Sequence, residues 1–166
     1  MNERKELPCI LSTQSKVRFQ DCDPYGHLNN SNYISYFLNH REDALKEDYD
    51  FDLFRLAKEK GRTWLVAQNQ IIYFQPAFVM ESIYIESQLI GLRSKVLEVE
   101  MRMYDQSGDK MKALLWSSFV HFDLKASKSI EHHPDDENLF KSVLKPVDQK
   151  TFEDRAGFLR RSLRPV

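Results

Sequence analysis

The order of two hydrophobic periods along the chain constrains its fold most. Apolar residues recur every three or four positions from about 30 to 46, which is typical of a helix with one apolar face. Four later segments alternate apolar and polar residues, as half-buried strands do: 63–75, 83–89, 97–103 and 110–124. Short turns join these strands, so we expect antiparallel pairing, because parallel strands need a long crossover. The sequence therefore predicts an α+β fold in which one sheet wraps around one long central helix.

The segments outside this block indicate a lead-in and an extension. Residues 1–14 are interpreted as a flexible lead-in, and the alternation that follows them predicts a strand at 15–21. The main domain is thus expected to span 15–125, followed by a C-terminal extension at 126–166. Short helices are predicted at 51–60, from Pro134 to Leu144, and from Thr151, which can cap with Asp154, to about Arg161.

Composition narrows the class of protein. The 166 residues suffice for one domain with a real core, and the formal net charge of −1 gives no sign of a nucleic-acid partner. The two cysteines, Cys9 and Cys22, do not suggest a disulfide framework and fit a reducing compartment. No apolar run follows the charged N-terminus, and none reaches the roughly 18 residues of a membrane span. We therefore expect a cytoplasmic protein with no nucleic-acid or membrane partner.

The stretch from Asp21 to Tyr36 has the highest density of groups useful for chemistry. A proline and a glycine within it indicate a turn between a strand and the long helix. This turn would bring a carboxylate, an imidazole and an amide, those of Asp23, His27 and Asn30, to the N-terminus of the helix. A helix N-terminus carries partial positive charge and unpaired N–H donors, which suit an anion or an oxyanion.

From Asp21 to Tyr33 the chain reads Asp-Cys-Asp-Pro-Tyr-Gly-His-Leu-Asn-Asn-Ser-Asn-Tyr. This resembles the signature Asp-x-Asp-x-x-Gly-His-x-Asn-Asn-x-x-Tyr of hotdog-fold acyl-CoA thioesterases of the 4-hydroxybenzoyl-CoA thioesterase type. Residues 71–85 resemble the family's strand, proline, acidic residue and next strand, so the resemblance covers about 16–124. It implies a hotdog fold and hydrolysis of acyl-CoA to free acid and coenzyme A. It also implies no cofactor beyond the substrate's own coenzyme A, no metal, and a homodimer or homotetramer with active sites between subunits.

The resemblance implies roles for the residues of the turn. Asp23 would be the catalytic carboxylate, either attacking the thioester carbon or activating water. Asp21 is the alternative carboxylate, but its parity with Val17 and Phe19 favours a structural role. His27 either bonds the thioester oxygen or bonds the backbone of the turn. Asn30 either orients the substrate or, as we favour, caps the helix. The backbone N–H of Gly26 or of His27 is the expected oxyanion donor, because glycine allows close approach.

Other residues are weaker candidates for substrate contact. Tyr33 is interpreted as core more readily than as a ligand, and Ser94 lies in a loop, 91–95, where related proteins approach the coenzyme A arm. The aromatic residues near the helix are candidates either for an acyl pocket or for the core. They are Tyr33, Tyr36, Phe37 and Phe74.

Two other functions stay open from the sequence. A thioesterase acting on acyl-carrier protein shares the Gly-His-x-Asn-Asn run, and it would need a basic surface for the acidic carrier. A non-catalytic hotdog domain that senses acyl-CoA would bind its ligand tightly without turnover. A serine hydrolase has no support, because no Gly-x-Ser-x-Gly elbow is present.

Overall fold

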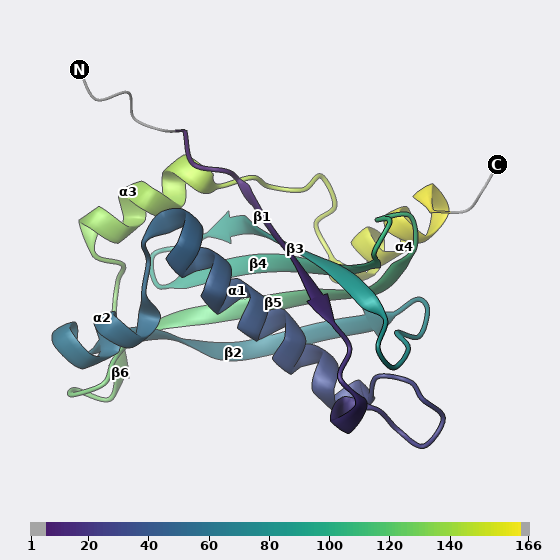
Figure 1. Cartoon of the computed structure of the whole chain (residues 1–166). Coiled ribbons are helices and arrows are strands. Elements are labelled where there is room, and N and C mark those ends of the chain that lie inside the picture. Colours follow the sequence, from purple (N-terminus) through teal and green to yellow (C-terminus); the bar gives the residue numbers. More distant parts are fainter. Residues whose placement is uncertain (1–5, 164–166) are drawn as a thin grey trace.

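Six strands form one curved antiparallel sheet in the computed structural model, which describes residues 6–163 (Figure 1). The order across the sheet is β1-β3-β4-β5-β2, and the short β6 pairs with β5. Neighbouring strands are antiparallel throughout, which confirms the α+β prediction. The strands are β1 (Ile10–Lys16), β2 (Arg62–Tyr73), β3 (Ser82–Leu92), β4 (Val96–Asp105), β5 (Met111–Asp123) and β6 (Lys128–Ser129).

Helix α1 (Tyr33–Tyr49) lies along the inner face of this sheet, as the helical period predicted (Figure 1). Its buried residues recur at steps of three and four, and Phe37 is fully enclosed. The facing strands supply a continuous apolar surface, so most of the core lies between the helix and the sheet. The fully buried side chains on that surface include Ile83, Val99, Met101, Met103, Ala113 and Leu115.

The N-terminal part differs from the prediction. Residues 10–14 are not lead-in, because they belong to β1, in which Ile10 lies opposite Gln88 of β3. The predicted strand at 15–21 is also wrong beyond Lys16, since Phe19–Asp21 forms a 3-10 turn and the Phe19 ring is exposed. The alternation of apolar and polar residues around Val17 lies in a turn. The strand itself, β1, carries mostly polar residues, so it lacks the apolar pattern of a half-buried strand. Residues 1–5 of the predicted lead-in lie outside the described part of the chain.

The smaller helices were mostly predicted. Helix α2 (Leu53–Lys60) ends at Gly61, which takes a left-handed conformation with φ +65°. Helix α3 (Pro134–Val143) packs its apolar residues into the main core beside β3. Helix α4 (Phe152–Ser162) begins at Thr151, whose hydroxyl accepts a hydrogen bond from the Asp154 backbone N–H at 3.1 Å. The C-terminal extension therefore carries both helices predicted for it.

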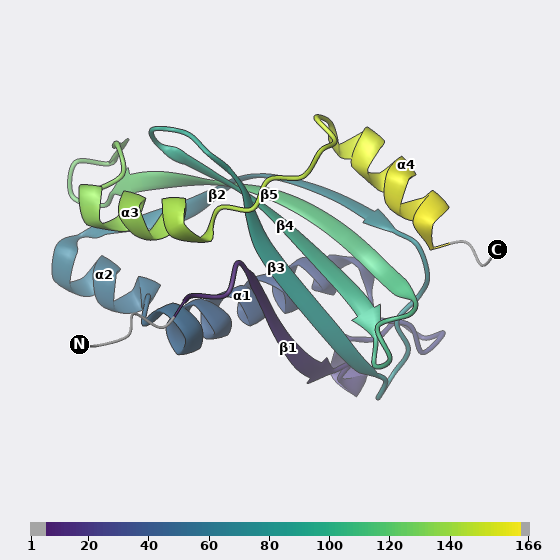
Figure 2. The same cartoon turned by 90° about the horizontal axis from the view of Figure 1, so that it is seen from above.

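Helix α4 covers the outer face of the sheet, opposite α1 (Figure 2). Phe152 and Ala156 pack against Met111 and Leu114 in a second apolar cluster, so the helix docks on its own chain. Phe158, on the same helix, remains substantially exposed.

A buried ion network fixes α4 to the sheet. The Glu100 carboxylate on β4 is fully buried and accepts two hydrogen bonds from the Arg155 guanidinium of α4, both at 2.8 Å. It also accepts a hydrogen bond from the Trp116 indole at 2.8 Å and pairs with Arg102. Burial alone would raise the pKa of Glu100, yet the hydrogen bonds from Arg155 and Trp116 and the two arginine charges hold it below its usual value.

Candidate active site

Asp23 organises the turn before α1. Its Oδ1 atom accepts hydrogen bonds from the backbone N–H of Tyr25 at 2.9 Å and of His27 at 3.1 Å. Its own N–H donates to the His27 carbonyl at 2.8 Å. Within residues 6–163, the second carboxylate oxygen, Oδ2, accepts no hydrogen bond. One oxygen thus orients the carboxylate, as Asp often does in turns, and the other stays available for chemistry.

The turn is held against the loop that precedes β3. The Leu28 N–H donates to the Ala77 carbonyl at 2.8 Å, and the Val79 N–H donates to the Gly26 carbonyl at 2.8 Å. Gly26 has φ +77°, a conformation that side-chain-bearing residues rarely adopt. These bonds fix the position of the Asp23 carboxylate relative to the sheet.

His27 presents its imidazole at the surface of this turn. The ring meets the Phe78 ring edge-on, with centroids 5.2 Å apart, and its nitrogens make no hydrogen bond to the described residues. The backbone of His27 is engaged in the turn, but the ring is not. Either ring nitrogen can therefore donate to a substrate oxygen.

The helix cap differs from the prediction. Asn29 caps the 3-10 turn Asn30–Asn32 that leads into α1, because its Oδ1 accepts from the Ser31 N–H at 3.1 Å and from the Ser31 hydroxyl at 2.9 Å. Its extended backbone places the side chain over this turn. Asn32, at the start of α1 itself, makes no side-chain cap bond to the described residues. The Asn30 side chain is exposed instead, and the Asn30 carbonyl accepts a hydrogen bond from the Tyr73 hydroxyl at 3.2 Å. Freed from capping, the Asn30 amide can point a donor at a bound substrate.

The backbone donors suggested for the oxyanion are already engaged. The Gly26 N–H donates to the Asp23 carbonyl at 3.0 Å, and the His27 N–H donates to the Asp23 carboxylate. Both N–H groups therefore have partners within the turn, and an oxyanion would have to compete with Asp23 for either of them. The side chains of His27 and Asn30 remain as donors near the carboxylate.

Asp21 has the structural role that we expected. Its Oδ2 accepts a hydrogen bond from the Tyr36 hydroxyl at 2.6 Å, and its carbonyl accepts from the Asn32 amide at 2.9 Å. Burial and the bond to Asp21 raise the pKa of Tyr36 to about 12, so this phenol stays protonated. The pair ties the 3-10 turn to the first turn of α1.

The two weaker candidates for substrate contact lie in the core and at the far end of β3. Tyr33 is buried in the core, and its hydroxyl accepts a hydrogen bond from the Ala77 N–H at 3.1 Å. Ser94 lies in the turn between β3 and β4, whereas the loop beside Asp23 lies at the other end of β3 (Figure 1). Eleven strand residues separate those ends by about 36 Å, so the same chain does not bring Ser94 and Asp23 together.

Cys22 is a poor nucleophile in this turn. Burial, followed by the charges of Asp21 and Asp23, raises the pKa of its thiol. Its Sγ lies 3.4 Å from the Arg18 carbonyl, to which the thiol donates. Because the thiolate is the reactive form, these surroundings disfavour thiol chemistry.

The sequence reasoning missed an apolar rim around the turn. Tyr25, Phe78 and Met80 are all large side chains with more than 45% of their surface exposed. They come from the Asp23 turn and from the loop before β3, which hydrogen-bonds to it. The only sequence signal was the apolar run after Pro76. Such a rim gives an acyl group or a second subunit an apolar surface beside the carboxylate.

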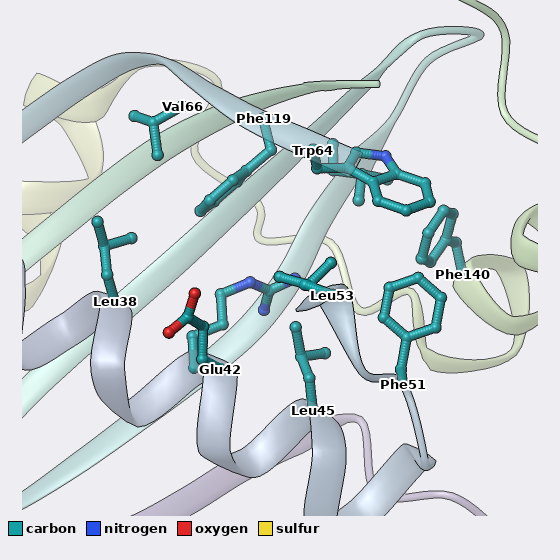
Figure 3. Close-up of a pocket in the computed structure, with 11 residues that line it drawn as sticks. Leu38, Glu42, Leu45, Phe51, Leu53, Trp64, Val66, Phe119 and Phe140 are labelled. Atoms are coloured by element: carbon teal, nitrogen blue, oxygen red, sulfur yellow. The ribbon is translucent and has the colours of Figure 1, made fainter. Parts of the chain in front are cut away.

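A pocket of about 120 Å³ opens between the middle of α1 and the strands β2 and β5 (Figure 3). Figure 3 shows Phe119, Trp64 and Phe140 on one side of the pocket and Leu38 and Leu45 of α1 on the other. None of the four aromatic residues proposed from the sequence lines it. Tyr33 and Phe37 belong to the core, and Phe74 packs beside the cluster under α4.

Comparisons with known proteins agree with the fold. A family model described as the Thioesterase-like superfamily matches residues 17–149. The long-chain acyl-CoA thioesterase FadM of Escherichia coli strain K12 is 30% identical over 122 residues, covering 72% of this chain and 89% of that protein.

Solved structures give the same result. YbaW, a probable thioesterase from Escherichia coli, has 26% sequence identity and a TM-score of 0.69, covering 81% of this chain and 99% of that one. Slr0204, a 1,4-dihydroxy-2-naphthoyl-CoA thioesterase from Synechocystis, has a TM-score of 0.72 at 11% identity, covering 80% of this chain and 96% of that one, so it shares the fold alone.

Among the described residues, no helix is long and apolar enough to span a membrane. The matched model covers the Asp23 turn, α1 and every strand of the sheet from β2 to β6. With its hotdog architecture of one curved sheet around one central helix, the chain belongs to the Thioesterase-like superfamily.

Proposed function

We propose that this protein hydrolyses acyl-CoA thioesters with Asp23 as the catalytic carboxylate. The observation that carries this proposal is the difference in hydrogen bonding between the two oxygens of that carboxylate. Oδ1 is held by two backbone N–H groups, while Oδ2 has no partner among residues 6–163. The family membership and the acyl-CoA thioesterase FadM, at 30% identity, support the choice of reaction.

The reaction consumes one water and releases a free acid and the thiol of coenzyme A. In one route, Asp23 takes a proton from water, the resulting hydroxide adds to the carbonyl carbon, and the thiolate leaves and is protonated. In the other, Asp23 Oδ2 adds to that carbon and expels the thiolate, and water then opens the mixed anhydride. Both routes place a negative charge on the carbonyl oxygen in the transition state.

The side chains of His27 and Asn30 are proposed to hold that oxygen. Both lie on the turn that Asp23 organises, and neither side chain makes a hydrogen bond to the described residues. The N-terminus of α1 adds a fixed partial charge of about +0.5, which favours an oxyanion in its vicinity. A donor pair at this position stabilises the transition state more than the neutral thioester.

We further propose a homodimer that pairs through the edge strand β2; a homotetramer would combine two such dimers. One edge of β2 pairs with β5, the other has no strand partner among the described residues, and Leu65 and Val66 are exposed. An open twelve-residue edge invites pairing. Two-fold antiparallel pairing would set the Tyr73 end of one copy beside the Trp64 end of the other. The Asp23 turn, tied to Tyr73 through Asn30, would then adjoin the pocket of the second subunit.

The test is release of free thiol from a panel of short-chain, long-chain and aryl acyl-CoAs. Asp23→Asn is expected to lower kcat/KM by at least about 100-fold, while the fold and the oligomeric state are retained. Asp48→Asn, on the exposed side of α1, is the matched control and should keep full activity. Equal activity of the parent and Asp23→Asn would refute the proposed role of Asp23.

The same panel separates the two alternative functions. Tight acyl-CoA binding by calorimetry without any thiol release would favour a sensor. Hydrolysis of acyl-carrier protein with little hydrolysis of the matching acyl-CoA would favour a carrier-protein thioesterase.

A further inference from the structure

Arg41 is a buried cation that has no counter-ion among residues 6–163. It projects from α1 into the pocket under the helix and is about nine-tenths buried. To the described residues it makes no hydrogen bond and no salt bridge. Its one specific contact is with the Phe119 ring, whose centroid lies 5.4 Å from the guanidinium carbon. The arginines on the outer face differ, because the buried Arg102 and the partly buried Arg155 both pair with Glu100.

The nearest carboxylate along the chain does not neutralise this charge. Glu42 follows Arg41 directly, and adjacent helix residues do not face each other. Glu42 is exposed at the mouth of the pocket, and Figure 3 shows its carboxylate on the helix side (Figure 3). Burial lowers the pKa of Arg41 to about 10, which still leaves the guanidinium charged at neutral pH. The pocket therefore contains a permanent positive charge.

Apart from Arg41 and from Glu42 at the mouth, the pocket is lined by apolar side chains, and it is small. Its volume of about 120 Å³ is close to that of apolar cavities that admit a benzene ring, roughly 150 Å³. The wall is built by aromatic and aliphatic side chains from α1, α2, α3, β2, β4 and β5 and from the segment before α2, as Figure 3 shows for those that it labels. The pocket thus has room for a ring or for the end of a short chain, beside one strong hydrogen-bond donor.

We propose that Arg41 selects acyl groups that carry an oxygen acceptor, above all a carboxylate, at the end remote from the thioester. The inference rests on the proposed function, since the acyl group reaches this pocket from the Asp23 turn of the adjoining subunit. An unsubstituted acyl chain would displace water from the guanidinium without offering an acceptor, which would leave the N–H groups of Arg41 without a partner. A distal carboxylate would accept charge-assisted hydrogen bonds in a site with few competing waters. The pocket walls would meanwhile bury the apolar part of the acyl group.

The test compares pairs of acyl-CoAs that differ only at the distal end. Octanoyl-CoA is paired with its ω-carboxyl analogue, and benzoyl-CoA with 4-carboxybenzoyl-CoA. The parent should prefer the carboxylated member of at least one pair, and Arg41→Gln should reduce this preference by about 10- to 100-fold. The loss should fall mainly on KM, because the distal contact is the same in ground state and transition state. Arg41→Lys should restore part of the preference.

Two further variants exclude a merely structural effect. Leu53→Glu places a carboxylate in the same pocket while leaving Arg41 in position, so it should abolish the preference in the same way. Arg55→Gln removes a guanidinium exposed on α2 and should leave the preference unchanged. An Arg41→Gln effect of equal size on both members of every pair, or no effect, would overturn the proposal.

Binding of the free acids separates this inference from the proposed function. Calorimetry with octanedioate and octanoate needs no turnover. If the parent hydrolyses no thioester but binds octanedioate in an Arg41-dependent manner, the proposed function fails and the pocket assignment stands. If the parent hydrolyses acyl-CoAs but Arg41→Gln changes neither the substrate preference nor octanedioate binding, the pocket assignment fails and the thioesterase remains.

Discussion

Replacing Glu100 by Gln is expected to lower the stability of the fold markedly, although the two side chains have nearly the same shape. The carboxylate is fully buried and is contacted by Arg102, Arg155 and Trp116. Removing one partner of a buried ion pair generally costs about 3–5 kcal/mol. Arg102 keeps two hydrogen bonds to Glu86, at 3.0 and 2.9 Å, so part of the network survives. We therefore expect the free energy of unfolding to fall by about 2–4 kcal/mol.

Thermal and denaturant unfolding measure this loss directly. For a chain of 166 residues, the expected loss corresponds to a Tm lower by about 5–15 °C. Glu137→Gln is the control, because its carboxylate pairs with Lys141 on the exposed face of α3 and should leave the Tm nearly unchanged.

The pH dependence provides a second readout. Because the pKa of Glu100 is held below its ordinary value near 4.5, its ionic stabilisation is present above that pH and is lost as the pH falls through the folded-state pKa. The stability difference between parent and Glu100→Gln should therefore be constant near neutrality and narrow below about pH 4.5. A variant with the parent's Tm and the parent's acid sensitivity would refute the network as a net stabilising element.

Two further predictions concern packing and backbone conformation. Phe37→Ala leaves a void between α1 and the sheet and should reduce the free energy of unfolding by about 3–5 kcal/mol, measured by urea titration. Gly61→Ala should cost about 1 kcal/mol, because an added Cβ meets nothing within 4 Å and the penalty comes from φ +65° alone. Gly157→Ala, inside α4, should instead stabilise by up to about 1 kcal/mol; stabilisation by both changes would contradict this explanation.

The helices and strands with a clear hydrophobic repeat could be predicted from the sequence. Those in which polar residues interrupt the repeat could not. The long helix and β4 follow their hydrophobic repeats closely, since each buries one face against the same core. The strand β1 was missed because Ser12 to Ser15 read as a polar tail. It is a strand because β3 offers it a paired edge, which is a property of the tertiary structure.

The candidate site was predictable in position but not in detail. The motif spacing located the turn of Asp23, His27 and Asn30 before α1, where the structure has it. The spacing could not show which backbone N–H groups form hydrogen bonds within the turn. Nor could it show that Asn29 is the residue that caps the 3-10 turn before α1. Arg41 fitted the apolar stripe of the helix by its spacing. Its lack of a counter-ion became visible only once the opposite strands were in place.

The order of strands across the sheet has a consequence for how the chain folds during synthesis. Among the described strands of one chain, β2 pairs with β5 alone, so Arg62 cannot pair until Asp123 has been synthesised. Ile10 of β1 likewise cannot pair until Gln88 has been synthesised. At about 5–20 residues per second, α1 is exposed to solvent or chaperones for several seconds before the last inner strand leaves the ribosome. Contacts of such long sequence separation place the domain among slow folders, in milliseconds to seconds rather than microseconds. In this interval, the nascent chain offers an unpaired β2 edge and an uncovered apolar helix, the features on which aggregation begins.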